Sequence, residues 1–214
     1  MQQFELIDFS DCKKTNRMYG GANGKKIGVF YNEERYLLKF AIENPNKEFD
    51  YFANHICEFL GCHIFNLCQI ESQHTILGTY KGIPVVACKD FREVGEEFYD
   101  FISIQNSILE IANGNQNYLE DILQTIELQD ILSKNLIKQH FWQTFIVDTL
   151  IVNFDRHNGN WGFIFNETKN QYKISLVFDS GSCLFPKILQ HKLTIILKDE
   201  NEINQRIYVS TFSN

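Results

Sequence analysis

Two short segments in the second half of the sequence carry the side chains best suited to chemistry. The first begins at Asp155 and ends at Asn160, and the second contains Asp179. Phosphoryl transfer needs a carboxylate to orient the acceptor hydroxyl, oxygen ligands for magnesium and a cation on the phosphates. Asp155 suits the first role, and Asn160 and Asp179 suit the second, because Mg²⁺ prefers hard oxygen ligands. These residues predict a catalytic carboxylate beside a metal site.

The cation that this chemistry requires is predicted to be Lys39. It alternates with apolar neighbours in the run 36–40, so it should point away from the core that those neighbours face. A glycine-rich stretch lies upstream, and its backbone N–H groups could approach phosphate oxygens. The residues expected to do so are Gly21, Ala22, Asn23 and Gly24.

Each of these features has a simpler interpretation when it is taken alone. Lys39 could be a solvated strand residue, the glycine stretch a turn, and the segment after Asp155 a helix end with a core histidine. Their order along the chain, at kinase-like intervals, favours the chemical interpretation. We therefore predict Asp155, Lys39 and Asn160 as the catalytic residues and Asn160 and Asp179 as the metal ligands.

The elements that must position these residues change in character along the chain. The first part predicts strands at 26–31, 35–40, 72–80 and 83–91, with a helix at 49–60 that stops at Gly61. The second part predicts helices at 98–112, 118–126 and 136–152 and a hairpin of 161–165 with 172–178. This pattern predicts an α+β chain with a β-rich N-lobe at 1–91 and a mainly helical C-lobe at 92–214.

Composition and charge exclude several classes of protein. The formal net charge is −7, with a pI of about 5.4, so we expect no direct nucleic-acid partner. The most apolar stretch, 141–154, is too short and too polar to span a membrane. The six cysteines are expected to be reduced thiols. A zinc site built from Cys57, Cys62, His63 and Cys68 is disfavoured, because the paired C-x-x-C spacing is absent.

Several stretches together resemble the HipA-like serine/threonine kinases, and most closely their CtkA-type, cell-translocating branch. The stretch 153–162, which reads N-F-D-R-H-N-G-N-W-G, is the most specific of them. The others are the glycine-rich stretch 20–26, the strand 36–40, the run 85–91 and the segment 178–182.

This resemblance implies a bilobal protein-kinase-like fold with ATP between the lobes. It makes Asp155 the catalytic base, Asn160 and Asp179 the Mg²⁺ ligands, and Lys39 the contact to the ATP phosphates. Cys88, Lys89, Asp90 and Phe91 become the hinge beside adenine. Glu58 becomes the partner of Lys39, with Asp50 as the alternative on the same helix. His157 is placed at the cofactor, where bracing the loop through its ring nitrogens is favoured over a catalytic role.

The predicted function is that of an ATP- and Mg²⁺-dependent protein serine/threonine kinase that autophosphorylates, as a toxin or effector. A phosphoinositide kinase and a catalytically silent ATP-binding module are the alternatives. Kinases of this type continue for roughly a hundred residues beyond the segment at Asp179, so the C-lobe is expected to be shortened and 187–214 to be polar and loop-like. The expected partners are a protein with a serine or threonine acceptor, and an antitoxin or a complementing chain. The expected location is the bacterial cytoplasm, with secretion into a host cell as a further possibility.

Overall fold

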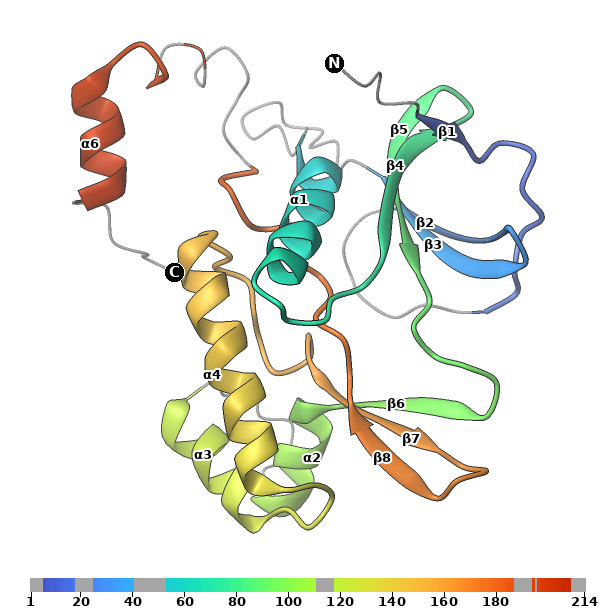
Figure 1. Ribbon diagram of the computed structural model, residues 1–214, viewed down its shortest axis with the longest axis vertical. Coiled ribbons are helices and arrows are strands. Elements are labelled where there is room, and N and C mark those ends of the chain that lie inside the picture. The colour runs from blue at the N-terminus through green and yellow to red at the C-terminus, as the bar shows by residue number, and fades with distance from the viewer. Residues whose placement is uncertain are drawn as a thin grey trace.

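A computed structural model describes residues 6–17, 25–40, 53–110, 118–186, 194 and 196–208. These residues form a five-stranded sheet with one helix packed on it, followed by a three-stranded sheet and a group of helices (Figure 1). The predicted phosphate-binding residues Gly21, Ala22, Asn23 and Gly24 lie outside the described residues, as does Asp50. The α+β class predicted from the sequence is confirmed.

The five-stranded sheet has the order β1-β4-β5-β3-β2. Its strands pair antiparallel, apart from the parallel pair of β1 with β4. The strands are β1 (Ile7–Asp8), β2 (Lys26–Tyr31), β3 (Glu34–Phe40), β4 (Thr75–Tyr80) and β5 (Ile83–Lys89). The sheet thus contains the four strands predicted for this part of the chain.

Two tight turns fix the register of this sheet. Asn32 and Glu33 join β2 to β3, and Lys81 and Gly82 join β4 to β5; all four residues have positive φ angles. Two-residue turns with positive φ match the right-handed twist of paired strands. The turns therefore join the strands predicted at 26–31 and 35–40, and those predicted at 72–80 and 83–91, into two hairpins.

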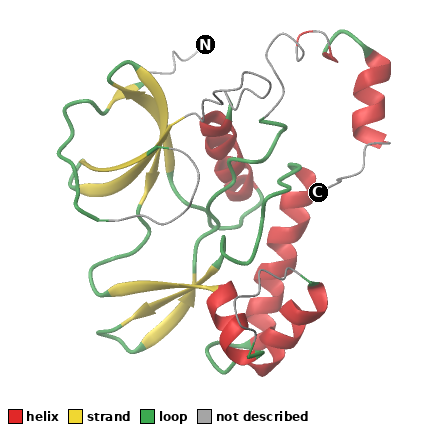
Figure 2. Cartoon of the chain, turned by 180° about the vertical axis from the view of Figure 1, so that it is seen from behind, coloured by secondary structure: helices red, strands yellow, loops and turns green. Residues whose placement is uncertain are grey.

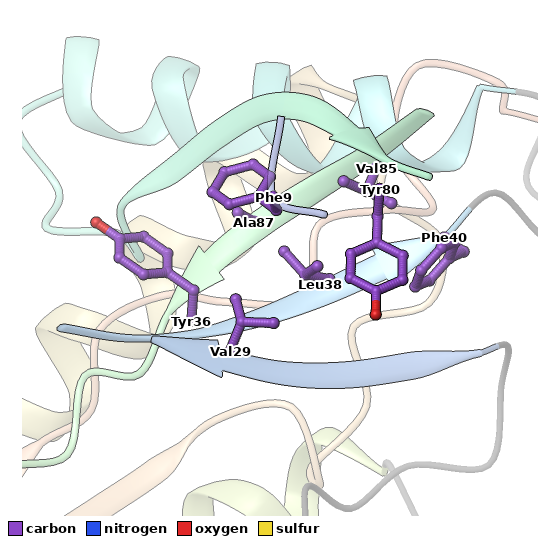
Figure 3. Close-up of a cluster of buried hydrophobic side chains, with 8 residues drawn as sticks. All are labelled: Phe9, Val29, Tyr36, Leu38, Phe40, Tyr80, Val85 and Ala87. Carbon is purple, nitrogen blue, oxygen red and sulfur yellow. The ribbon is translucent and has the colours of Figure 1, made fainter. Parts of the chain in front are cut away.

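One face of the sheet is a hydrophobic core, and this decides where Lys39 points. Figure 3 shows Leu38, Phe40 and Val29 in a cluster with side chains from β4 and β5 and with Phe9, which follows β1. Leu38 is fully buried and Phe40 is 4% exposed. Because side chains alternate along a strand, Lys39 between them lies on the opposite face, as predicted.

Helix α1 (Asn54–Leu67) packs on β4 and β5. The prediction that it stops at Gly61 is wrong, since Gly61 lies buried in the middle of the helix. A Cβ atom at this position would lie 2.6 Å from the Cβ of Ser180. Gly61 therefore serves close packing against the segment that contains Asp179, and not helix termination.

The second part of the chain joins a three-stranded sheet, of order β6-β7-β8, to three helices (Figure 2). Its strands are β6 (Glu96–Asp100), β7 (Gly162–Asn166) and β8 (Gln171–Ile174). Its helices are α2 (Phe101–Ile108), α3 (Leu119–Leu128) and α4 (Lys134–Leu150). None of the helices in the described ranges combines the length and the apolar character that a membrane-spanning helix needs.

Three predictions for this part were wrong in their bounds or their type. The second strand of the hairpin was predicted as 172–178, whereas β8 ends at Ile174. Residues 98–100 were predicted as helix but belong to β6, because they pair with β7, and α2 begins only at Phe101. The carboxylate of Asp100 accepts the N–H of Ser103 and caps that helix. Beyond 187, residues Glu200–Tyr208 form helix α6, whereas a loop was predicted.

Candidate functional site

Lys39 lies at the centre of the site, between two carboxylates. Its Nζ atom is 3.0 Å from Oε2 of Glu58 and 2.8 Å from Oδ1 of Asp179. Burial acts to lower the pKa of Lys39, but the charges of Asp179 and Glu58 outweigh it and hold that pKa well above its usual value. Lys39 is therefore a fixed positive charge at the point where β3, α1 and the segment of Asp179 meet.

Glu58 is almost completely buried, with 1% of its surface exposed, and it lies on the face of α1 that packs on the sheet. Its carboxylate reaches Lys39 from the neighbouring helix. A buried carboxylate needs such a partner, because an unpaired buried charge is strongly destabilising. Glu58 thus occupies the position that the resemblance implied for the helix glutamate.

Lys26 adds a second cation to the same region. It is the Cα partner of Lys39 across β2 and β3, so both side chains leave the same face of the sheet. Burial lowers the pKa of Lys26, and the charge of Lys39 lowers it further, while Asp179 and Glu58 act in the opposite direction. This places two ammonium groups on the same face of the sheet, an arrangement that suits binding of a polyphosphate.

The loop that begins at Asp155 is folded by its own hydrogen bonds. The backbone oxygen of Asp155 accepts the N–H of His157 at 3.0 Å and the side-chain amide of Asn160 at 3.2 Å. The ring Nδ1 of His157 accepts the N–H of Gly159 at 3.1 Å. Asn160 is buried, whereas the side chain of Asp155 is exposed. These hydrogen bonds therefore fix Asn160 and leave the carboxylate of Asp155 exposed. His157 stabilises the loop through its bond to Gly159.

Arg156 joins this loop to the segment of Asp179, a role that the sequence analysis missed. Its guanidinium makes a two-pronged pair with the buried carboxylate of Asp148 on α4, at 2.8 and 3.2 Å. It also donates to the backbone oxygens of Asn160 and Phe178 and to Oγ of Ser180. One signal was present in the sequence, since Asp148 interrupts an apolar helix eight residues before Arg156.

A second anchor holds the loop to the helices of the C-terminal part. The side-chain N–H of Asn158 donates to the side-chain oxygen of the buried Gln105 on α2 at 2.9 Å. The side-chain oxygen of Asn158 accepts the indole N–H of Trp161. Trp161 stacks on Phe101 with ring centroids 4.0 Å apart. Helix α2, which no sequence motif linked to the site, therefore supports the loop.

The segment of Asp179 has an unusual backbone conformation at Asp179, the predicted metal ligand. Asp179 has a φ angle of +59°, in the left-handed region, which aspartate tolerates better than most residues. The ring of the preceding residue, Phe178, packs on two other rings. Its centroid lies 5.4 Å from that of Phe91 and 5.5 Å from that of Phe98. These contacts connect the predicted hinge, strand β6 and the Asp179 segment through one aromatic cluster.

The predicted hinge residues differ in what they offer a ligand. Cys88 is fully buried and packs against Leu37 and Val86. The ammonium of Lys89 pairs with the carboxylate of Glu34 at 2.5 Å. The carboxylate of Asp90 is 2% exposed and pairs with Arg17 at 3.3 Å and Arg92 at 3.0 Å. The side chains of Lys89 and Asp90 are therefore engaged in structural pairs, which leaves backbone groups and Phe91 as the groups suited to a planar base.

The residues at the site fit a magnesium ion and a triphosphate. The side-chain amide N–H of Asn160 donates to the backbone oxygen of Asp155, which leaves the side-chain oxygen of Asn160 available to a metal ion. Asp179 contributes a carboxylate with 46% of its side chain exposed. One guanidinium nitrogen of Arg156 bonds the backbone at both Asn160 and Phe178, so the two ligand-bearing segments lie side by side. The oxygen atoms of Asn160 and Asp179 suit magnesium, and the ammonium of Lys39 suits the phosphate groups.

A cavity of about 460 Å³ opens beside the ion pair of Arg156 and Asp148. It lies between α3, α4 and the loop, and its lining is mostly aromatic and aliphatic; Lys39, Glu58 and Asp179 do not line it. Large apolar side chains are also exposed along α4 and just beyond it, namely Leu136, Trp142, Phe145, Ile146, Leu150 and Phe154. We call these six residues the α4 face.

Comparison with known proteins identifies a close relative. The chain is 42% identical over 205 residues to the serine/threonine-protein kinase CtkA of Helicobacter pylori strain J99, and the match covers 94% of the chain. It spans 63% of the length of that relative. No protein-family model matches the chain.

A solved structure of CtkA gives the same result. The crystal structure of a Helicobacter pylori proinflammatory kinase, CtkA, superposes with a TM-score of 0.90 at 41% identity and covers 98% of this chain and 72% of that one. The HipA protein of Shewanella oneidensis, solved with HipB and operator DNA, matches with a TM-score of 0.48 at 13% identity, over 74% of this chain and 43% of that one.

Proposed function

Because the chain belongs to the family of the CtkA kinases, we propose that it is an ATP- and magnesium-dependent serine/threonine protein kinase that also phosphorylates itself. The observation that carries this proposal is the contact of Lys39 with both Glu58 and Asp179. It brings a phosphate-binding cation and a metal-binding carboxylate together in one site. This arrangement has a direct use in phosphoryl transfer and is costly to maintain for stability alone.

In the proposed reaction each residue has a separate task. Lys39 and Lys26 hold the phosphates of the nucleotide, and Glu58 orients Lys39. Asp179 and the side-chain oxygen of Asn160 hold magnesium, which when bound neutralises charge that develops on the phosphates. Asp155 orients the acceptor hydroxyl and takes its proton.

The hinge contributes binding of the base. The backbone around Asp90 and the ring of Phe91 provide polar groups and an apolar surface between the two sheets. Since the carboxylate of Asp90 is held by arginines from three parts of the chain, Arg17, Arg35 and Arg92, we propose that it fixes the hinge and does not contact the ligand.

The direct test is incubation of the purified chain with labelled ATP and Mg²⁺ beside Asp179→Asn and Asp155→Ala. We expect label in the chain and in a generic serine- and threonine-containing acceptor protein, and its loss in both variants. Nucleotide binding without transfer would instead identify a silent module. Label in phosphoinositide vesicles, with none in protein, would identify a lipid kinase.

The α4 face is a surface on which a further polypeptide could pack. Exposed apolar patches of this kind mark sites of polypeptide contact. The chain matches 63% of the length of its relative, and we propose that polypeptide equivalent to the unmatched part of that relative covers the α4 face. Such a cover would also close the cavity beside Arg156 and so support the catalytic loop.

The site of action is proposed from the relative. CtkA is a bacterial kinase that is described as proinflammatory. We propose that this chain acts in the bacterial cytoplasm or, after secretion, in a host cell.

A further inference from the structure

Ser182 lies where a phosphate acceptor would be expected. Its hydroxyl Oγ is 3.4 Å from Oδ2 of Asp155, the proposed catalytic base. Asp155 is exposed and Ser182 is partly exposed, so both face the open side of the site. An acceptor hydroxyl must be within reach of the base that takes its proton. Ser182 meets that condition from within the chain.

The backbone on both sides of Ser182 is anchored, so this contact is not that of a loosely placed surface residue. Ser180 is fully buried, and its hydroxyl accepts a hydrogen bond from Arg156. Cys183 is also fully buried; its N–H donates to the backbone oxygen of Ser180, and its thiol donates to the backbone oxygen of Cys57. The segment can therefore hold the Ser182 hydroxyl beside Asp155.

The two serines of this segment are not equivalent. Ser180 is fully buried, and its hydroxyl contacts the guanidinium of Arg156. Ser182, two residues later, contacts the proposed base and is accessible. Geometry alone thus separates a structural hydroxyl from a reactive one.

We propose that Ser182 is the residue that the chain phosphorylates on itself, in an intramolecular reaction; this proposal rests on the proposed kinase function. The Ser182 oxygen attacks the terminal phosphorus of a bound nucleoside triphosphate, and a new oxygen–phosphorus bond forms. The bond from that phosphorus to the bridging oxygen breaks, and the nucleoside diphosphate leaves. The hydroxyl proton passes to the carboxylate of Asp155.

The product would also regulate the site. A phosphoserine carries about −1.5 to −2 charges near neutral pH, and here it would lie beside the carboxylate of Asp155. The negative charge of the phosphate opposes binding of a second triphosphate, and its bulk beside Asp155 blocks access of a protein hydroxyl to the base. Phosphorylation of Ser182 is therefore expected to slow transfer to external acceptors.

The test combines site mapping with kinetics. The chain is incubated with ATP and Mg²⁺, and its peptides are analysed by mass spectrometry beside Ser182→Ala, Ser182→Thr and the exposed control Ser107→Ala on α2. We expect a phosphopeptide at 182 in the wild type and in the control, its loss with alanine, and its return as phosphothreonine with threonine. The rate constant should not change when the chain is diluted.

A binding measurement separates this result from a folding defect. Calorimetric titration with Mg²⁺ and a non-hydrolysable ATP analogue should give the same affinity for Ser182→Ala as for the wild type. Phosphate that maps elsewhere, unchanged in Ser182→Ala, would overturn the inference and leave the kinase function standing. A rate that rises with chain concentration would show transfer between copies and also overturn it. No label in either the chain or an acceptor would defeat the proposed function and this inference together.

Discussion

The ammonium of Lys39 on β3 lies 3.0 Å from the carboxylate of Glu58 on α1, and both groups are largely buried. The contact fixes the helix against the sheet and leaves the other side of the ammonium to Asp179. Three separate stretches of chain therefore converge on one nitrogen atom. Changes at this point should affect both function and folding.

Replacing Lys39 with methionine should remove the phosphate-binding cation and leave Glu58 buried without its partner. We expect phosphoryl transfer to fall by about 10² to 10³-fold and the melting temperature to fall as well. Lys13→Met, at an exposed position before β2, is the matched control and should change neither. Transfer at the wild-type rate in Lys39→Met would contradict the assignment.

Stability at low pH should report on Asp179. The positive charge of Lys39 lowers the pKa of Asp179, although burial acts to raise it. A carboxyl whose pKa is lower in the folded chain stabilises the fold above its ordinary pKa of 3.8 and loses that effect as the pH falls. The difference in unfolding free energy between wild type and Asp179→Asn should thus be constant above about pH 5 and shrink below about pH 4.

Urea unfolding at several pH values measures this difference. Other carboxyls titrate in both proteins, so the comparison isolates residue 179. If the difference in unfolding free energy between the two proteins stays constant down to the acid transition, Lys39 does not hold Asp179 ionised.

The pair of Arg156 and Asp148 should couple stability to catalysis. Arg156→Met leaves a buried carboxylate unpaired, which typically costs about 3 to 5 kcal/mol. Because Arg156 positions the loop and touches no reacting group, we expect kcat to fall and the KM for ATP to change little. A double-mutant cycle with Asp148→Asn should give a coupling energy of about 0.5 to 3 kcal/mol. Additive effects would show that the two residues act separately.

Gly61→Ala should destabilise the protein even though alanine is the better helix former. The new Cβ would meet the Cβ of Ser180 at 2.6 Å, and such overpacking typically costs about 1 to 3 kcal/mol. Ser180→Gly removes the opposing atom, so the double variant should recover part of the loss that the alanine causes. A more stable single variant would mean that the helix and the Asp179 segment do not pack this closely.

The α4 face should behave as an uncovered surface. Phe145 and Leu150 are 54% and 70% exposed, so Phe145→Asp and Leu150→Asp should change the unfolding free energy by less than about 0.5 kcal/mol. They should also reduce self-association and weaken binding of the polypeptide equivalent to the unmatched part of CtkA. Light scattering and a pull-down measure the two effects. A large loss of stability would place these side chains in the core.

Local sequence patterns were sufficient where the structure depends on neighbouring residues. The hairpin turns at 32–33 and 81–82 and the outward direction of Lys39 follow from turn chemistry and strand alternation, which are properties of a few consecutive residues. The placement of Asp155, Asn160 and Asp179 in two loops was likewise predicted from motif spacing. Their catalytic roles and the division of the lobes at residues 91 and 92 stay predictions.

Local patterns failed where distant parts of the chain decide the outcome. Gly61 was predicted to end a helix but lies inside one. Glycine is needed there because Ser180, from a distant part of the chain, leaves no room for a Cβ atom. Residues 98–100 were predicted as helix but pair with β7, more than 60 residues away along the chain.

The sequence by itself therefore determined which chemical groups this protein carries, their order, and the strands and turns that present them. The tertiary structure confirmed the contact of Glu58 with Lys39 that the resemblance implied. It alone decided that Arg156 meets Asp148 and that Ser182 meets Asp155. Spacing along a chain constrains local conformation, whereas contacts between distant residues depend on how whole elements pack. A buried charge must then find whichever partner that packing brings within reach.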